Sequence, residues 1–460
     1  MKFAFTMKLN RVEQGVLYSC RKVGKRMMKY KKVFVIFISI MFSLGLAGCS
    51  RQEDAERTEY TEEVKIPMLL TIDPSTGNKN EEDVITAFNE EYKGRYQIDV
   101  EWALQTEEEY RTNLKRLNVT DELPAIITDL RLLPSFYQLM LKDERIEDLS
   151  PVINKDEEWK KIIEPAVLEA CTESDGSIYL APLSTAFYSC SGVFWNEQLF
   201  RQAGIEAFPK TWEEFWDCCD KLQNSGITPL ALHTEGTAWA PMLLATAELA
   251  DSEEGVQFMD ALYPDSYQNE NGLQLAGTLK KLFQYTTENA MYNDFDVAYE
   301  NFVSGKVAMI PNGYWMIDQI PKSMESSVRF SPFPGNKLIS SPETFGWGVV
   351  SGYSEKVKKA AVVFLKYRTA FNLKQKEELL SADPQNNSQL LNDYIKAYTE
   401  NPQIVPNYQV KWSSVLQEQT LGEIIPKLAK DQMTEEEFVR RADELSLIHI
   451  SEPTRHAQIS

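Results

Sequence analysis

Strand-like and helix-like segments alternate in the first part of this chain, and this order limits the folds that it can adopt. We expect a strand over residues 66–72, a helix opening near Asn80, a strand over 96–102, a helix over 107–117 and a strand over 124–129. Parallel strands must be joined by crossover connections, which are usually helices. The order therefore predicts an α/β protein with a mostly parallel sheet and helices on both faces.

Similar signals continue along the rest of the chain. Thr211 followed by Glu214 is a capping box, in which the two side chains bond reciprocally to the first turn of a helix, and Gly226 ends that helix. Thr434 and Glu437 repeat the box and open a last helix. Further strands are expected over 184–195, 307–310 and 348–351.

Charge and composition exclude several classes of function. The chain has 460 residues and a net charge of -20, which argues against nucleic acid as a partner and allows two or three domains. It has only three histidines, and its six cysteines show no CxxC spacing, so a zinc site of Cys and His is excluded. No phosphate-binding loop or GxSxG motif is present either. We expect no metal, no cofactor and no catalytic residues.

The N-terminal region has the features of an export signal. Basic residues precede a short apolar run over 33–47, which is too short for a comfortable membrane span of about 20 residues. The run ends in Leu-Ala-Gly before Cys49, which resembles a bacterial lipoprotein cleavage box and implies a lipid, such as palmitate, on Cys49. The alternative is an ordinary N-terminal anchor with a chance cysteine. Residues 1–48 are interpreted as an over-extended start plus signal peptide, and 49–65 as a tether.

The C-terminal region has an unusual sequence. Residues 445–460 resemble the translation of a sequencing adapter, so we interpret them as an assembly artefact. The alternative is a natural flexible tail. In either case the segment is left out of the fold prediction.

Several segments together resemble the extracellular solute-binding proteins of ABC importers, in the sugar-binding family 1 that is typified by maltose-binding protein. The segments are DGSIYLAP at 175–182, VFWNEQLF at 193–200, PKTWEEF at 209–215, GITPL at 226–230, FVSGKVAM at 302–309 and GYW at 313–315. No single segment decides the match, but their order and spacing are specific. The resemblance covers most of residues 62–444.

The resemblance implies a periplasmic-binding-protein-like fold, with two α/β lobes joined by a multi-segment hinge and a ligand cleft between them. Lobe 1 is expected to hold residues 66–183 and 346–375, and lobe 2 residues 184–345 and 382–444. The protein would act as a monomer, bind carbohydrate and deliver it to the permease subunits of an importer at the outer face of the bacterial membrane.

The hinge is expected where the chain crosses between the lobes. The crossings are placed near Pro182–Leu183, near Ser341–Phe345 and near Lys374–Ser381. Ligand would close the lobes about these segments, and the importer would recognise the closed form.

Sugars present polar edges and apolar faces, so their sites combine aromatic rings with hydrogen-bonding side chains. The resemblance implies stacking roles for Trp315, which follows Tyr314, and for Trp412. Positions near strand ends and crossings add further candidates, which are Trp239, Trp347, Tyr188, Asp129 and Glu235. Each aromatic could instead be a packing residue, and Asp129 could only cap a helix.

Two other functions are compatible with the sequence. The same fold could bind a non-sugar solute or serve as the ligand-sensing subunit of a membrane receptor. A secreted glycoside hydrolase would need two carboxyl groups facing each other at about 5–10 Å, and nothing in the sequence indicates such a pair.

Overall fold

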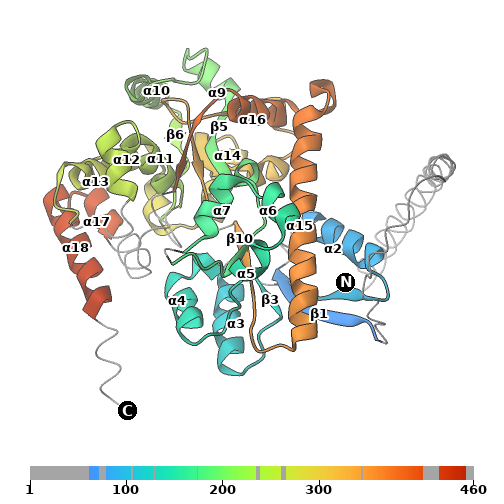
Figure 1. Cartoon of the computed structure of the whole chain (residues 1–460). Helices are drawn as coiled ribbons and strands as arrows, with labels where there is room; N and C mark the ends of the chain where they lie inside the picture. Colours follow the sequence, from blue (N-terminus) through green and yellow to red (C-terminus); the bar gives the residue numbers. More distant parts are fainter. Residues whose placement is uncertain are drawn as a thin grey trace, which may run out of the picture. The chain divides into compact units, whose positions relative to one another are not determined.

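The strands of this protein form two separate sheets, with helices packed against both (Figure 1). All residues described below belong to the unit that begins at Thr61. The computed structural model describes residues 62–71, 79–104, 107–128, 130–173, 175–234, 239–260, 266–342, 345–407 and 424–451.

The first sheet has the strand order β2-β1-β3-β10-β4. Its strands are β1 (Val64–Thr71), β2 (Tyr96–Ala103), β3 (Ile126–Ile127), β4 (Leu180–Pro182) and β10 (Gly346–Val349). β1 runs parallel to both β2 and β3, whereas β10, which comes from far along the chain, runs antiparallel to β3 and β4. The expectation of parallel pairing is confirmed for the first three strands only.

Helices cover both faces of the first sheet. Neighbouring residues of β1 therefore pack in two different cores. Leu70 packs in a cluster with Phe88 and Phe364, whereas Leu69 packs with Tyr110 and Leu114 in a second cluster. The helices of this part are α2 (Lys79–Glu91), α3 (Glu107–Val119), α4 (Pro134–Lys142), α5 (Ser150–Ile153), α6 (Glu157–Ile162), α7 (Pro165–Cys171) and α15 (Glu355–Ser381).

The second sheet is mixed, with both parallel and antiparallel pairs. Its order is β11-β9-β5-β7-β6, with β8 paired to β5 as well. β5 is antiparallel to β7, β8 and β9, while β6 is parallel to β7 and β11 is parallel to β9. The strands are β5 (Cys190–Asn196), β6 (Thr228–Leu230), β7 (Val307–Gly313), β8 (Val328–Ser331), β9 (Lys337–Ser340) and β11 (Gln403–Pro406).

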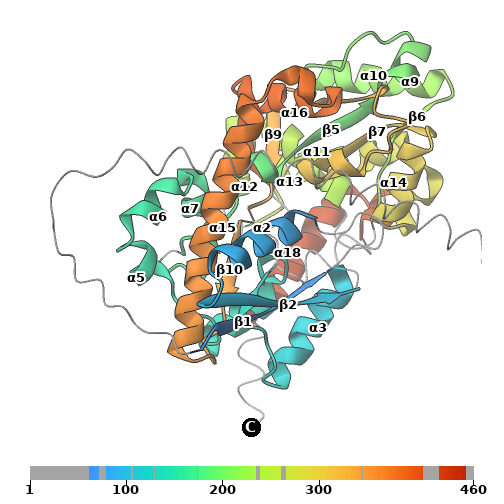
Figure 2. The same cartoon turned by 90° about the vertical axis from the view of Figure 1, so that its right-hand side faces the viewer.

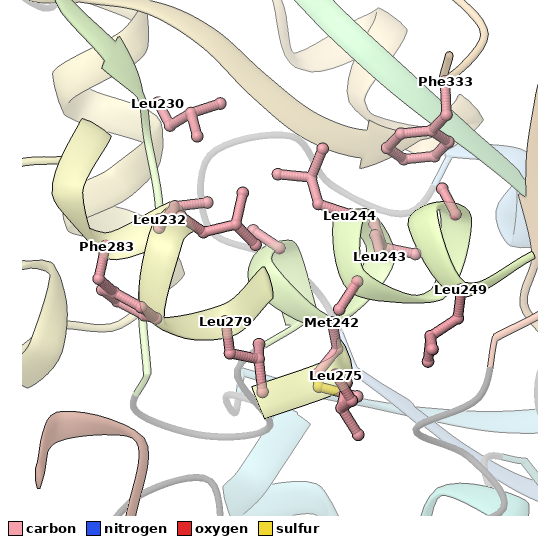
Figure 3. Packing of buried hydrophobic residues seen from close by; sticks show 14 of the residues in the cluster. Leu230, Leu232, Met242, Leu243, Leu244, Leu249, Leu275, Leu279, Phe283 and Phe333 are labelled. Atoms are coloured by element: carbon pink, nitrogen blue, oxygen red, sulfur yellow. The ribbon is translucent and has the colours of Figure 1, made fainter. Parts of the chain in front are cut away.

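The largest core lies between this sheet and a group of helices centred on α11. Nearly every residue of α11 is buried, as expected for a helix that is apolar on all sides. Figure 3 shows Met242 of α11 (Trp239–Leu249) next to Leu275 of α13 (Glu270–Leu282). The helices of this part are α8 (Ala186–Ser189), α9 (Glu197–Gln202), α10 (Trp212–Asn224), α11 (Trp239–Leu249), α12 (Glu253–Asp260), α13 (Glu270–Leu282), α14 (Phe295–Val303), α16 (Gln389–Thr399), α17 (Ile425–Ala429) and α18 (Glu435–Ser451).

α15 is the longest helix among the described residues, and it enters the cores of both sheets. Its 27 residues span about 40 Å at about 1.5 Å per residue. Phe364 packs in the core of the first sheet, and Leu379 packs against a cluster around Phe187 beside the second sheet. Figures 1 and 2 show the helix passing along elements of both sheets. The crossing expected near Lys374–Ser381 therefore lies inside a continuous helix.

Two expected strands differ from the structure. Residues 186–189 form the short helix α8, so the strand expected over 184–195 begins only at Cys190. Polar and apolar residues of this segment are almost all buried, so its pattern does not separate a helix from a strand. The strand expected over 348–351 lies two residues earlier, at Gly346–Val349.

Candidate ligand-binding site

Two tryptophans meet at one edge of the second sheet. β6 and β7 are neighbouring parallel strands, so the chain leaves both at the same edge, which is where open α/β sheets bind ligands. Trp239 opens α11 after β6, and Trp315 follows β7 in the 3-10 helix η4 (Tyr314–Gln319). Their ring centroids lie 6.3 Å apart at 56°. The two side chains form a tilted aromatic pair.

Trp315 differs from the other described tryptophans in its exposure. Trp315 is 37% exposed and is the one tryptophan in the described part of the chain with an open side chain. Trp239 packs partly against the large core, and its Nε1 atom is buried without a described hydrogen-bond partner. An exposed ring beside a half-buried one can receive the apolar face of a ligand while the indole N–H binds an acceptor.

Tyr188 and Tyr314 also meet, but inside an aromatic cluster. Their ring centroids lie 5.0 Å apart, and both rings pack against Phe187. Burial raises the pKa of Tyr314 to about 12, and burial together with the neighbouring Tyr314 raises the pKa of Tyr188. Both hydroxyl groups therefore stay protonated near neutral pH and can donate or accept a hydrogen bond.

The ring of Trp347, which lies between two glycines in the sequence, is partly covered by neighbouring side chains. The guanidinium of Arg368 lies 4.9 Å from its ring centroid, and the ring of Phe364 lies at 6.5 Å. The rings of Trp347 and Phe364 pack in the core of the first sheet. The structure thus places Trp347 beside a buried cation rather than with the Trp239–Trp315 pair.

Four residues of interest from the sequence lie outside the described residues. They are the lipidation candidate Cys49 and the ligand candidates Asp129, Glu235 and Trp412.

Asn293 is a polar residue that the sequence analysis missed. It is only 6% exposed, and neither side-chain amide atom has a hydrogen-bond partner among the described residues. The backbone carbonyl oxygen of Asn293 accepts a bond from the backbone N–H of Thr234 at 3.3 Å. This bond places Asn293 beside the chain that leaves β6 towards Trp239. A buried amide with a free donor and a free acceptor is suited to a hydroxyl-bearing ligand. No sequence motif marks this position.

Other aromatic and sulfur-bearing residues have packing roles. Trp212 is buried in the large core, and Trp216 packs against it with Lys281 at 4.0 Å from its ring centroid. Cys171 and Cys190 are both buried free thiols.

The described residues show no metal or membrane feature. No group of three His, Cys, Asp or Glu residues among them is placed to hold a metal ion. None of the helices in the described ranges combines the length and apolar character needed to cross a membrane.

An α/β fold with an aromatic pair at a sheet edge is typical of proteins that bind small molecules. Comparison with known families gives the same class: residues 83–377 match the bacterial extracellular solute-binding protein family. The match covers more than half of the chain, so the protein belongs to this family. Its members are binding proteins rather than enzymes.

Individual relatives agree with this assignment. The chain is 27% identical over 177 residues to a "Probable sugar-binding periplasmic protein" of Rhizobium meliloti, covering 38% of this chain and 41% of the relative. It is 24% identical over 202 residues to the "Xylose/arabinose-binding protein XacG" of Haloferax volcanii, covering 42% of each. The chain thus spans about two-fifths of the length of these curated relatives.

A solved structure supports the fold over a longer range. A "Chitin oligosaccharide binding protein" superposes with a TM-score of 0.66 at 21% identity, covering 84% of this chain and 98% of that one. At this identity the likeness establishes the fold, which is that of the periplasmic binding proteins.

Proposed function

We propose that this protein captures a carbohydrate, specifically an oligosaccharide, outside the cell and delivers it to an ABC importer. Two of the relatives are named for sugars, and the solved structure is named for an oligosaccharide. The family assignment supports capture of a solute, and the aromatic residues of this chain support a sugar.

The observation that carries this proposal is the pairing of Trp239 with Trp315. A sugar ring has an apolar C–H face that stacks on an indole, and its hydroxyl groups need donors and acceptors at the rim. Trp315 offers an exposed ring, and the Nε1 of Trp239 and the amide of Asn293 offer unused polar atoms. Trp412 and Tyr188 remain proposed ligand residues on the strength of the resemblance and of position.

Membrane attachment and lobe closure are part of the same proposal. A lipid on Cys49 would hold the protein at the outer face of the membrane, with residues 49–65 as a tether. Residues 66–183 and 346–375 would form one lobe and residues 184–345 and 382–444 the other. Ligand would favour the closed arrangement, which the permease subunits would recognise.

The proposal is tested by thermal unfolding of the full-length chain with a panel of mono- and oligosaccharides. A ligand at 100 times its Kd adds about 2.7 kcal/mol to the free energy of unfolding. We expect a selective upward shift in Tm that is lost in Trp315→Ala and Trp239→Ala. Trp216→Phe, which changes a packing residue on α10, is the matched control and should retain the shift. A folded sample that responds to no sugar would contradict the proposal.

A further inference from the structure

Two of the basic residues on α15, Lys376 and Arg368, form ion pairs that differ in one respect. Lys376 binds Oε1 of Glu164, and the other oxygen of Glu164 accepts a 2.8 Å hydrogen bond from the Ala186 N–H. Both oxygens of that carboxylate are therefore in use. This pair is complete within the protein.

The second pair is incomplete. Nη2 of Arg368 binds Oε1 of Glu81, but Oε2 of Glu81 and both Nε and Nη1 of Arg368 are buried without a hydrogen-bond partner in the described part of the chain. The Arg368 side chain is only 7% exposed, so water does not reach these atoms freely. Burial raises the pKa of the Glu81 carboxyl even though Arg368 acts against this effect. Buried charged groups with unused hydrogen-bonding atoms are uncommon and require an explanation.

The two members of the incomplete pair come from segments far apart in the sequence. Glu81 belongs to α2 and Arg368 to α15, so two distant helices bring unused polar atoms to one place.

The available atoms indicate the chemistry of a ligand. Arg368 offers N–H donors, and Glu81 offers a charged acceptor. Two adjacent hydroxyl groups on a sugar can meet such a set, because each hydroxyl both donates and accepts. Since Glu81 already neutralises Arg368, a ligand carboxylate or phosphate would bring an uncompensated negative charge into a buried site, which is costly.

We infer that Glu81 and Arg368 form a polar subsite that binds neighbouring hydroxyl groups of an uncharged sugar. This inference rests on the proposed function and specifies the class of sugar. The Arg368–Trp347 contact positions the guanidinium, so Trp347 acts in this site as a support for Arg368 rather than as a stacking platform.

The test is isothermal titration of the full-length chain with galactose, xylose, arabinose, raffinose and chitobiose, and with galacturonate as the charged counterpart of galactose. We expect the wild-type protein to bind at least one neutral sugar and to prefer galactose over galacturonate. Arg368→Lys keeps the charge but lacks the Nε and Nη1 donors, so we expect it to bind the best neutral sugar at least about tenfold more weakly. Lys366→Met, on the same helix, removes an ion pair with Asp156 away from this site and should stay within about threefold of wild type.

Each outcome separates this inference from the proposed function. If a neutral sugar binds the wild type and Arg368→Lys binds it equally well, the charge alone matters and the subsite is wrong. A preference for galacturonate would also overturn it. If Arg368→Lys does not fold, the double variant Glu81→Gln/Arg368→Met, which removes both charges together, takes its place with the same expected loss. If the folded wild type binds no sugar in the panel, the proposed function fails and the inference fails with it.

Discussion

The indole of Trp315 lies directly against the backbone of Gly313. A Cβ atom at position 313 would come within 2.3 Å of the Trp315 ring, which is closer than any real contact. The backbone at Gly313 is extended, with φ of -100°, so the glycine is needed for this close approach and not for its backbone conformation. The orientation of the exposed indole therefore depends on the absence of a side chain two residues earlier.

Gly313→Ala should consequently displace the Trp315 ring and weaken sugar binding without unfolding the protein. We expect a loss of affinity of at least about tenfold, because one stacking ring is misplaced, together with a changed tryptophan fluorescence spectrum. Titration calorimetry and fluorescence measure the two effects.

Gly277→Ala is the matched control for this prediction. Gly277 lies within α13, and a Cβ there would meet nothing within 4 Å. This variant should keep the affinity and gain about 0.4–1 kcal/mol in the free energy of unfolding. Unchanged affinity in Gly313→Ala would show that the Trp315 ring is not held by this contact or does not bind sugar.

Local signals in the sequence predicted the helix starts well. The hydroxyl of Thr211 accepts a 3.2 Å bond from the Glu214 N–H, and Glu214 reaches back to the N–H of Lys210. The second box is complete, since Thr434 and Glu437 bond reciprocally at 3.1 Å and 3.0 Å. These contacts join residues within one turn of a helix, so the sequence alone contains the information.

Contacts between distant segments were not predictable in the same way. Trp239 meets Trp315 only because β6 pairs with β7, and no local pattern specifies that pairing. Arg368 meets Glu81 across 287 residues, and both belong to helices whose charged residues the sequence analysis would assign to a solvated face. The polar residues of the candidate site were therefore missed, although several of its aromatic residues were named.

The large core around α11 should determine the stability of the second sheet. Leu244 is completely buried there, so Leu244→Ala should lower the free energy of unfolding by about 2–5 kcal/mol through lost apolar contact and a cavity. Urea unfolding followed by circular dichroism measures this. Leu273→Ala, at a position that is 36% exposed on α13, should cost less than about 1 kcal/mol. Equal losses for the two variants would contradict the packing described here.

The four described cysteines should be unreactive in the folded protein. Burial raises the pKa of Cys171 and of Cys218 to about 12, and it also raises the pKa of Cys190 and of Cys219. Since the thiolate is the reactive form, iodoacetamide at pH 8 should leave all four unlabelled in the native state. Peptide mass spectrometry should then find all four labelled after unfolding in urea without a reducing agent. Failure of Cys171 and Cys190 to label under those conditions would indicate that they form a disulfide.

Glu248 gives a prediction about pH and stability. Its carboxylate accepts bonds from Thr278 at 2.7 Å and from Trp216 at 3.2 Å, and both Lys281 and Asp251 lie close enough to influence it. Burial is the largest effect and raises the pKa of Glu248 above its ordinary value of 4.5. The folded state therefore holds the proton more strongly than the unfolded state does.

The stability that Glu248 contributes should be complete at pH values below 4.5 and should be lost as the pH rises through its raised folded-state pKa. Glu248→Gln cannot ionise. Its one oxygen can accept the bond from the Trp216 N–H, and its amide N–H can donate to the Thr278 hydroxyl, which lies against the other carboxylate oxygen of Glu248. The stability of this variant relative to wild type should consequently increase between pH 5 and pH 8, as measured by urea unfolding at both pH values. A difference that stays constant over this range would show that ionisation of Glu248 is not coupled to folding.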